Sequence, residues 1–208
     1  ILKVDVKHYF DSIDHMILIS ILKRKIKDPR VIWLIETILN NHNRGRGDGS
    51  FGMPLGNLTS QFLANVYLNE LDHFIKQELK IKYYIRYVDD FVILHNSHRQ
   101  LQNYKFKINN FLKNKLKLEL HPDKSKILKL SDGINFLGFR IFYNHKLIRK
   151  KNLRKFEKKF AYYKKLYKDD LIDREKIIEI FEGWLAYVSH ANTYRYRRHL
   201  TRQFNKFF

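Results

Sequence analysis

Two adjacent carboxylates, Asp89 and Asp90, stand in the middle of an apolar stretch that runs from Tyr84 to Ile93. Aromatic and β-branched residues on both sides predict a strand, a tight turn at the acids and a second strand. Neighbouring carboxylates repel each other and lose hydration when they are buried, so a bound cation would stabilise the pair. The stretch therefore predicts a metal site, and it leaves open a surface hairpin with an Asp-Asp turn.

A third acid, Asp5, interrupts an alternating apolar and polar pattern over residues 1–8 that predicts a strand. Aspartate is poorly suited to strand interiors, so Asp5 is either a solvated edge residue or a ligand. Together with Asp89 and Asp90 it would complete a site for two divalent ions. Such ions lie about 3.5 to 4 Å apart and stabilise the attacking and leaving oxygens of a phosphoryl transfer, and oxygen ligands suit Mg²⁺.

The composition sets the class of protein and of partner. With 208 residues, 44% of them hydrophobic and 15% aromatic, the chain is long enough for one large or two small packed domains. A net charge of +20 favours a polyanionic partner, most commonly nucleic acid. No run of eighteen apolar residues is present, so we expect no membrane partner. The absence of cysteine excludes disulfides and thiolate metal sites and fits a cytoplasmic location.

The elements that must position these acids follow from cap, turn and periodicity signals. Ser12 or Asp14 is a candidate cap for a first helix, and the five glycines between Arg44 and Gly56 predict a loop whose backbone approaches a ligand closely. The sequence predicts helices at about 13–25, 28–40, 57–79 and 96–114, and strands at 116–120, 125–130, 134–142 and 146–149. This order indicates an α+β fold, a sheet with helices on one face.

The character of the chain changes near residue 150. Residues 146–208 hold 18 Lys or Arg against 7 Asp or Glu. Helical periodicity predicts three helices, at about 151–167, 174–190 and 192–207. We therefore expect two domains, 1–149 and 150–208, with the second a basic helical unit that grips a nucleic-acid backbone. The alternative is that the charges only form a solvated face.

Five motifs in this order resemble those of reverse transcriptases, and the resemblance covers essentially all 208 residues. They are the stretches at residues 4–11, 52–61, 87–90, 123–125 and 136–139. The resemblance implies a right-hand polymerase fold, with the palm and part of the fingers in 1–149 and a helical thumb in 150–208. Because Ile1 is not a start methionine, we expect upstream fingers residues to be missing from this chain.

The resemblance also implies the roles of individual residues. Asp5, Asp89 and Asp90 would be catalytic together with Lys124, for which Lys126 is the alternative. The implied metal ligands are Asp5, Val6, Asp89 and Asp90, which would hold two Mg²⁺ ions with Mn²⁺ as a substitute. The implied nucleotide-binding residues are Lys7, His8, Tyr9, Phe10, Leu55 and Gly56. The implied template and primer contacts are Asn57, Ser60, Gln61, Tyr87, Phe136, Leu137, Gly138, Lys155, Lys158 and Lys159.

Three of these positions carry more specific expectations. The ring of Phe10 would lie under the incoming sugar and leave no room for a 2′-hydroxyl. The alternative is that Phe10 is only an aromatic residue of the hydrophobic core. Leu55 and Gln61 stand where most related enzymes have glutamine and proline, and this departure resembles the reverse transcriptases of diversity-generating retroelements. Because Leu55 offers no hydrogen bond to a nucleotide, we expect an error-prone enzyme with mistakes biased to template adenines.

The expected partners are an RNA template, a DNA or RNA primer, a deoxynucleoside triphosphate and, by resemblance, a small basic accessory protein. The expected location is the cytoplasm of a bacterial or archaeal cell, with a phage gene as another source. Several alternatives stay open. They are a group II intron-like, retron or defence-associated reverse transcriptase, and an RNA-binding module of the same shape that lacks catalysis. An intron-encoded maturase would be expected to continue beyond the thumb.

Overall fold

A computed structural model describes residues 1–42, 51–54 and 56–207 of the chain. The chain divides into two compact units, Ile1–Leu128 and Lys129–Phe208, each of which is described by itself. The division falls before the boundary predicted at residues 149 and 150. The reason is that the strands at 134–148 form a sheet of their own, separate from the sheet that carries the acids.

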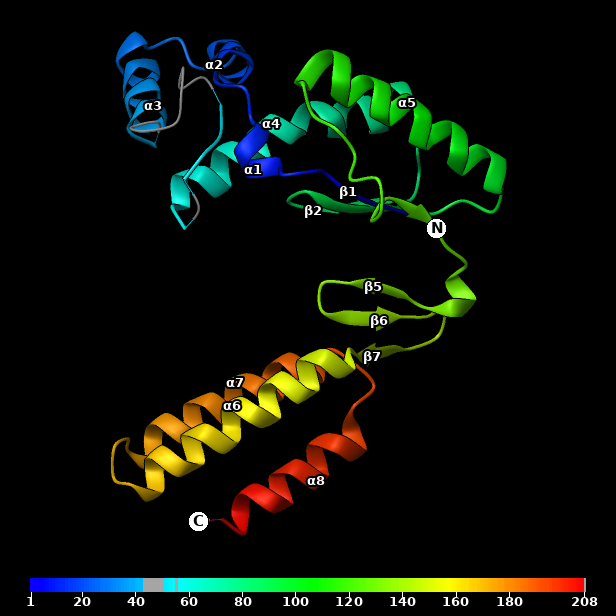
Figure 1. Ribbon diagram of the computed structural model, residues 1–208. Helices are drawn as coiled ribbons and strands as arrows, with labels where there is room; N and C mark the ends of the chain where they lie inside the picture. The colour runs from blue at the N-terminus through cyan, green and yellow to red at the C-terminus, as the bar shows by residue number, and fades with distance from the viewer. Residues whose placement is uncertain (43–50, 55, 208) are drawn as a thin grey trace. The chain divides into compact units, whose positions relative to one another are not determined.

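The first unit is built on a four-stranded antiparallel sheet with the strand order β2-β3-β1-β4 (Figure 1). Side chains alternate across the first strand as predicted: Leu2 and Val4 are fully buried, whereas Lys3 and Asp5 are partly exposed. A strand that alternates in this way has one face on the core and one face toward solvent. The strands are β1 (Leu2–Asp5), β2 (Tyr84–Tyr87), β3 (Asp90–Ile93) and β4 (Lys126–Ile127).

The helices of the first unit supply the other half of its core. Figure 1 shows α4 and α5 on the same side of the sheet. Their buried residues form one cluster with Leu2, Val4 and Phe91. The helices are α1 (Tyr9–Ser12), α2 (His15–Lys23), α3 (Pro29–His42), α4 (Leu58–His73) with its π-helical continuation η1 (Phe74–Glu78), and α5 (His98–Leu116).

Two helix starts in this unit follow from side-chain caps. Asp14 accepts a hydrogen bond from the amide of Ile17 at 3.0 Å, and Ser97 accepts one from the amide of Gln100 at 3.3 Å. Each cap satisfies an amide that has no partner within its helix. Asp14, one of the two predicted caps, therefore begins α2.

The second unit contains a small antiparallel sheet and three helices (Figure 1). A short turn, η2 (Leu130–Asp132), leads into the strands β5 (Ile134–Phe136), β6 (Phe139–Ile141) and β7 (Lys146–Ile148). The predicted helices are present as α6 (Lys150–Lys168), α7 (Arg174–Ser189) and α8 (Tyr194–Asn205). Phe156, Phe160, Ile177 and Phe181 form the core between them, and Phe204 of α8 packs against this core.

None of the helices in the described part of the chain combines the length and the apolar character that crossing a lipid bilayer requires.

Candidate active site

The pairing of β1 with β3 brings together two acids that are 85 positions apart in the sequence. Asp5 and Asp90 are direct partners in the antiparallel register, as are Val4 and Phe91. Directly opposed residues on neighbouring strands have Cβ atoms about 5 Å apart. The sheet therefore places Asp5 beside the acidic turn without any help from a loop.

The turn that joins β2 to β3 carries the remaining acid. The hairpin is present as predicted, but Tyr87 and Asp90 close it, so its two central residues are Val88 and Asp89 rather than the two acids. Val88 has a φ of 55°, in the left-handed region. A β-branched residue is costly there, and backbone strain of this kind is concentrated at functional sites.

Two lysines neutralise the paired acids. Lys124 lies with its Nζ 3.2 Å from Oδ1 and 3.4 Å from Oδ2 of Asp5. The Nζ of Lys3 lies 3.3 Å from Oδ2 of Asp90. Ser125, which is buried, donates its hydroxyl to the backbone carbonyl of Asp5 at 3.2 Å and so fixes this end of β1.

Burial and mutual repulsion act on the acids of the turn. Burial raises the pKa of Asp89 above its ordinary value, and the negative charge of Asp5 raises it further. Burial also raises the pKa of Asp90, against the opposing positive charge of Lys3. The carboxylates of the turn are thus less stable as anions than free aspartate, which is the condition that a bound cation relieves.

The donor set suits a hard cation, although the side chains are not arranged around one. Among the described residues, no three His, Cys, Asp or Glu side chains are positioned to hold a metal ion. Oδ1 of Asp90 is nevertheless buried and lacks a hydrogen-bond partner in the described part of the chain. A buried carboxylate oxygen without a partner is costly, and a divalent cation would satisfy it. The predicted ligand set of Asp5, Val6, Asp89 and Asp90 stays a prediction.

Arg86, in the middle of β2, ties the acidic turn to helix α4. Its Nη1 donates to the carbonyl oxygen of Val88 at 2.9 Å and to Oδ1 of Asn65 at 3.1 Å. Its Nε donates to Oδ1 of Asp72 at 2.8 Å, and its Nη2 pairs with the other oxygen of that carboxylate. Tyr84 donates its hydroxyl to the same carboxylate at 2.6 Å. A bidentate pair of this kind fixes orientation as well as charge.

The residues predicted to bind a nucleotide occupy different environments. Lys7 and His8 are exposed, and His8 has a φ of 46°. Tyr9 is buried, and its hydroxyl donates to the carbonyl of Ala64 at 2.5 Å, which places this ring in the core. Phe10 is half-buried and lies edge-on against Tyr9 with ring centroids 5.5 Å apart.

The described part of the second motif packs beside Phe10. The amide of Met53 donates to the carbonyl of Phe10 at 2.8 Å, and the amide of Gly52 donates to the carbonyl of Ile13 at 2.8 Å. Leu55, to which the fidelity hypothesis is attached, lies outside the described residues, as do the glycines at 45, 47 and 49. Gly56 is exposed, with a φ of 87°.

The predicted template and primer contacts divide between the two units. In the first unit Asn57, Gln61 and Tyr87 are exposed, whereas Ser60 is buried within α4. In the second unit Phe136 is buried, and Leu137 and Gly138 form the turn between β5 and β6 with φ values of 48° and 85°. Lys155, Lys158 and Lys159 are exposed on α6.

The sequence analysis did not identify the residues that contact the acids or their turn from distant positions in the sequence. It described the hairpin as apolar except at its tip, and thereby overlooked Arg86 and the partners of Arg86 on α4. An arginine within an otherwise apolar strand is the signal that was available, because such a charge requires a buried partner. No comparable signal identifies Lys3 as the partner of Asp90, since lysines alternate with apolar residues in many solvated strands.

Comparison with known proteins gives a consistent result. Residues 1–141 match the reverse transcriptase (RNA-dependent DNA polymerase) family. The chain is 29% identical to the group II intron-encoded protein LtrA of Lactococcus lactis, over 66% of this chain and 34% of that protein. It is 28% identical to protein YkfC of Escherichia coli, over 73% of this chain and 48% of that protein. It is also 26% identical to the putative COX1/OXI3 intron 2 protein of Saccharomyces cerevisiae, over 67% of this chain and 23% of that protein.

The chain thus spans from about a quarter to about half of the length of these curated relatives. The family match covers more than half of the chain and includes the strands and the turn that carry the three acids. The chain therefore belongs to the reverse transcriptase (RNA-dependent DNA polymerase) family.

Proposed function

We propose that this chain carries the catalytic centre of an RNA-directed DNA polymerase, which copies an RNA template by adding deoxynucleotides to a primer. The single observation that carries the proposal is the register that sets Asp5 opposite Asp90, one residue from Asp89, in a chain of this family. Carboxylates at the ends of neighbouring rigid strands in the middle of a sheet are a suitable support for phosphoryl transfer. In this proposal the first unit contains the palm and part of the fingers, and the helices of the second unit form the thumb.

The proposed metal ligands are Asp5, Val6, Asp89 and Asp90. When bound, two Mg²⁺ ions, or Mn²⁺ in their place, would supply the Lewis acidity for attack of the primer 3′-hydroxyl and departure of pyrophosphate. The chain itself orients the carboxylates through the β1–β3 register and the Arg86 contacts with the turn. Lys124 lies beside Asp5, where its ammonium group would neutralise the leaving pyrophosphate once it separates from that carboxylate.

Phe10 is the proposed discriminator between deoxyribose and ribose. Its half-buried ring lies edge-on against Tyr9, and the amide of Met53 donates to the backbone carbonyl of Phe10, so both the ring and the backbone of this residue have a fixed neighbour. Lys7 and His8, both exposed next to Asp5, are the proposed contacts for the triphosphate. We place Tyr9 in a supporting role, because its hydroxyl is used by Ala64.

Two candidate roles remain within the family. Leu55 and Gln61 favour an error-prone enzyme of a diversity-generating retroelement, biased to template adenines. The names of the relatives favour the second candidate, a group II intron-encoded reverse transcriptase. Sequencing of cDNA made by the wild type and by Leu55→Gln separates the first candidate from the second. An adenine-biased error spectrum that Leu55→Gln corrects supports a diversity-generating role, and an unbiased spectrum in both proteins contradicts it. The accessory protein and the cytoplasmic location stay predictions.

Primer extension tests the proposal directly. The complete protein is incubated with an RNA template, an annealed DNA primer, the four deoxynucleotides and Mg²⁺, and Asp89→Asn is compared with Asp170→Asn. Asp170 is exposed in the second unit, so the same chemical change there should leave extension intact. We expect Asp89→Asn to abolish product while RNA binding is retained. If Asp89→Asn extends the primer as well as the wild type does, the assigned catalytic centre is wrong. If the wild type binds RNA and makes no product, the protein is better described as an RNA-binding module that lacks catalysis.

A further inference from the structure

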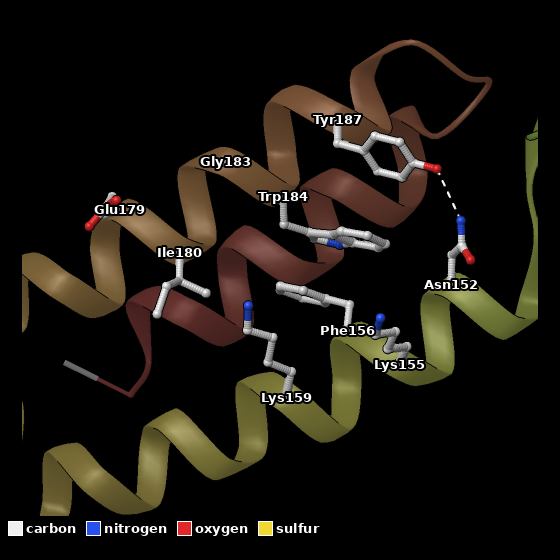
Figure 2. A pocket seen from close by; sticks show the side chains of 9 residues that line it. All are labelled: Asn152, Lys155, Phe156, Lys159, Glu179, Ile180, Gly183, Trp184 and Tyr187. Carbon is white, nitrogen blue, oxygen red and sulfur yellow. Dashed lines mark hydrogen bonds between the residues drawn. The ribbon is translucent and has the colours of Figure 1, made fainter. Parts of the chain in front are cut away.

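A groove runs between α6 and α7 in the second unit (Figure 2). Its volume of about 460 Å³ falls within the range of small-ligand pockets, which is roughly 300 to 1,000 Å³. From α6 it is lined by Asn152, Lys155, Phe156 and Lys159, and from α7 by Glu179, Ile180, Gly183, Trp184 and Tyr187.

The floor of the groove is aromatic and held in a fixed orientation. Phe156 and Trp184 are stacked with ring centroids 4.2 Å apart and planes within 4° of parallel. The indole nitrogen of Trp184 donates to the hydroxyl of Tyr196 on α8 at 3.3 Å, which holds the ring in place. Phe156 covers one face of Trp184, and the ring of Tyr187 lies 5.4 Å from the indole, so the exposed rim of this rigid aromatic cluster is the surface that a flat ring such as a nucleobase can contact.

Gly183 keeps the groove open at a cost to its own helix. Glycine within a helix is less stable than alanine, and here the backbone is in the ordinary helical region rather than at positive φ. A Cβ at this position would meet no atom within 4 Å, so no close neighbour requires glycine either. Neither the backbone conformation nor the packing therefore requires glycine at this position, and its small size leaves the space beside Trp184 open.

The charge of the groove suits an anion at its rim. Lys155 and Lys159 are exposed on α6, and Figure 2 shows both side chains beside Phe156. The one acid of the lining, Glu179, accepts a hydrogen bond from Lys176 at 2.7 Å and is neutralised by it. A phosphate therefore meets a net positive rim next to the aromatic floor.

The end of the groove near the small sheet is polar. The amide nitrogen of Asn152 donates to the hydroxyl of Tyr187 at 3.1 Å and to the carbonyl of Gly138 at 3.2 Å (Figure 2 shows the first of these bonds). These contacts fix two hydrogen-bonding groups at one end of the aromatic floor. They also join the groove to the turn between β5 and β6.

We propose that this groove binds one unpaired nucleotide of single-stranded RNA. The base enters the space beside Gly183 and contacts Trp184, and the flanking phosphates are held by Lys155 and Lys159. This inference rests on the proposed function for its choice of RNA, the template of a reverse transcriptase. The combination of a fixed aromatic surface with a positive rim is the usual design for unpaired nucleotides and does not require a particular base sequence.

Tryptophan fluorescence gives a direct test, because the chain has two tryptophans. Trp33→Phe, a change at an exposed position of α3, leaves Trp184 as the reporter. The 208-residue chain with this change is titrated with a short unstructured oligoribonucleotide and with the same oligonucleotide that lacks its bases. We expect the base-containing strand to quench Trp184 and to bind about tenfold more tightly than the abasic strand, near the lower end of the range for a base in contact with an aromatic side chain.

A matched pair of variants on α7 locates the effect. Gly183→Leu adds a side chain at the groove, at a position where a Cβ meets no atom within 4 Å, and should make the two strands bind equally. Ala186→Leu adds similar bulk at an exposed position of the same helix that does not line the groove, and should preserve the tenfold preference. Replacing Lys155 and Lys159 with glutamine should weaken both strands alike and flatten the dependence of affinity on salt.

Four results would overturn the inference. The first is equal affinity of the wild type for the base-containing and abasic strands, and the second is an unchanged preference in Gly183→Leu. The third is an equal response to a deoxyribonucleotide strand, which would remove the assignment to RNA. Absence of quenching by any strand overturns it as well and favours a protein segment as the occupant. The test requires no polymerisation, so a failure of primer extension together with base-dependent binding would contradict only the proposed function.

Discussion

The guanidinium of Arg86 donates a hydrogen bond to the carbonyl oxygen of Val88, 2.9 Å away, and thereby holds the backbone of the turn that carries Asp89. The same guanidinium is anchored to Asp72 on α4, so the turn is positioned by a helix as well as by its own strands. Val88 has a positive φ that valine disfavours, and such a conformation persists only where neighbouring contacts impose it.

Arg86→Lys should therefore impair catalysis more than substrate binding. Lysine keeps the positive charge but cannot bond Asp72, Asn65 and the carbonyl of Val88 together. We expect kcat for primer extension to fall by roughly 10- to 100-fold, because small displacements of reacting groups are costly, while KM changes little. The free energy of unfolding should drop by about 1 to 3 kcal/mol. Steady-state kinetics and urea denaturation measure the two effects.

Arg99→Lys is the matched control, since Arg99 is exposed on α5. It should change neither kcat nor stability. An equal loss of kcat in both variants, or a rise in KM with kcat unchanged in Arg86→Lys, would show that Arg86 does not position the turn.

Asp89→Asn should stabilise the fold at neutral pH while it removes activity. Folding raises the pKa of this carboxyl, so the ionised form destabilises the folded state above the folded pKa and has no effect below the unfolded pKa, near 4. Asparagine removes the penalty, so we expect the free energy of unfolding to rise by roughly 0.5 to 1 kcal/mol at pH 7, and this gain to disappear as the pH falls toward about 4. Urea denaturation without divalent ions, across that pH range, measures the free energy of unfolding.

Glu182→Gln, the same change from carboxylate to amide at an exposed position in the middle of α7, serves as the reference and should show no such gain. Lower stability of Asp89→Asn at pH 7 would mean that the ionised carboxylate makes a net favourable contact. In that case the penalties from burial and from the charge of Asp5 would be smaller than the free energy gained from that contact.

Gly138→Ala should be much more damaging than Gly56→Ala. Both glycines have similar positive φ values, 85° and 87°, so alanine pays the same conformational cost of about 1 to 2 kcal/mol at each. A Cβ at Gly56 meets nothing within 4 Å, whereas one at Gly138 would clash with the hydroxyl of Tyr187. We expect total losses of about 1 to 2 and about 2 to 5 kcal/mol respectively, measured by chemical denaturation.

Removing the clashing hydroxyl tests the cause. In a Tyr187→Phe background the cost of Gly138→Ala should fall by roughly 1 kcal/mol. Strictly additive effects would show that the contact between these two positions does not set the cost.

Asp14→Asn should weaken the first unit at neutral pH and not in acid. Burial raises the pKa of Asp14, but hydrogen bonds from Lys117 and from the amide of Ile17 outweigh it, so the pKa is lowered overall. A lowered pKa stabilises the fold above the unfolded value, near 4, and this contribution is lost as the pH falls through the folded value. Asparagine still caps α2 but loses the ion pair, for an expected cost of about 1 kcal/mol at pH 7.

The measurement is the free energy of unfolding of both proteins from pH 7 down to about 3, where the two values should converge. Lys117→Ala should cause a similar loss, and the double variant should lose little more than either single one. A difference that persists unchanged at the acid end would assign the effect to the cap rather than to the charge.

Local signals were sufficient for much of this fold. The caps Asp14 and Ser97, the apolar hairpin around the acids and the aromatic periodicity of α6 each lie within a few residues of what they specify. The prediction of a strand at 116–120 was wrong because α5 extends to Leu116 and ends there in a left-handed cap. Lys117 adopts a φ of 50° and ends α5, and the amide of Leu118 bonds back to the carbonyl of Leu112.

The site was predictable only in part, because its partners are distant in the sequence. The three acids were found from residue type and from the resemblance. The pairing of Asp90 with Lys3 and of Arg86 with Asp72 depends on the strand register and on the position of α4, which no local pattern encodes. Likewise the burial of Tyr9 follows from its contact with Ala64, far along the chain.

Lys3 and Lys124 give the two paired acids a counter-ion that the polypeptide itself provides. These ion pairs stabilise the sheet in the presence or absence of divalent ions. A chelator should therefore stop DNA synthesis without unfolding the protein. If the proposed Mg²⁺ ions bind at these acids, they would have to displace the two ammonium groups. Magnesium binding should accordingly be weaker, more reversible and more sensitive to the magnesium concentration than in a centre whose acids have no lysine partners.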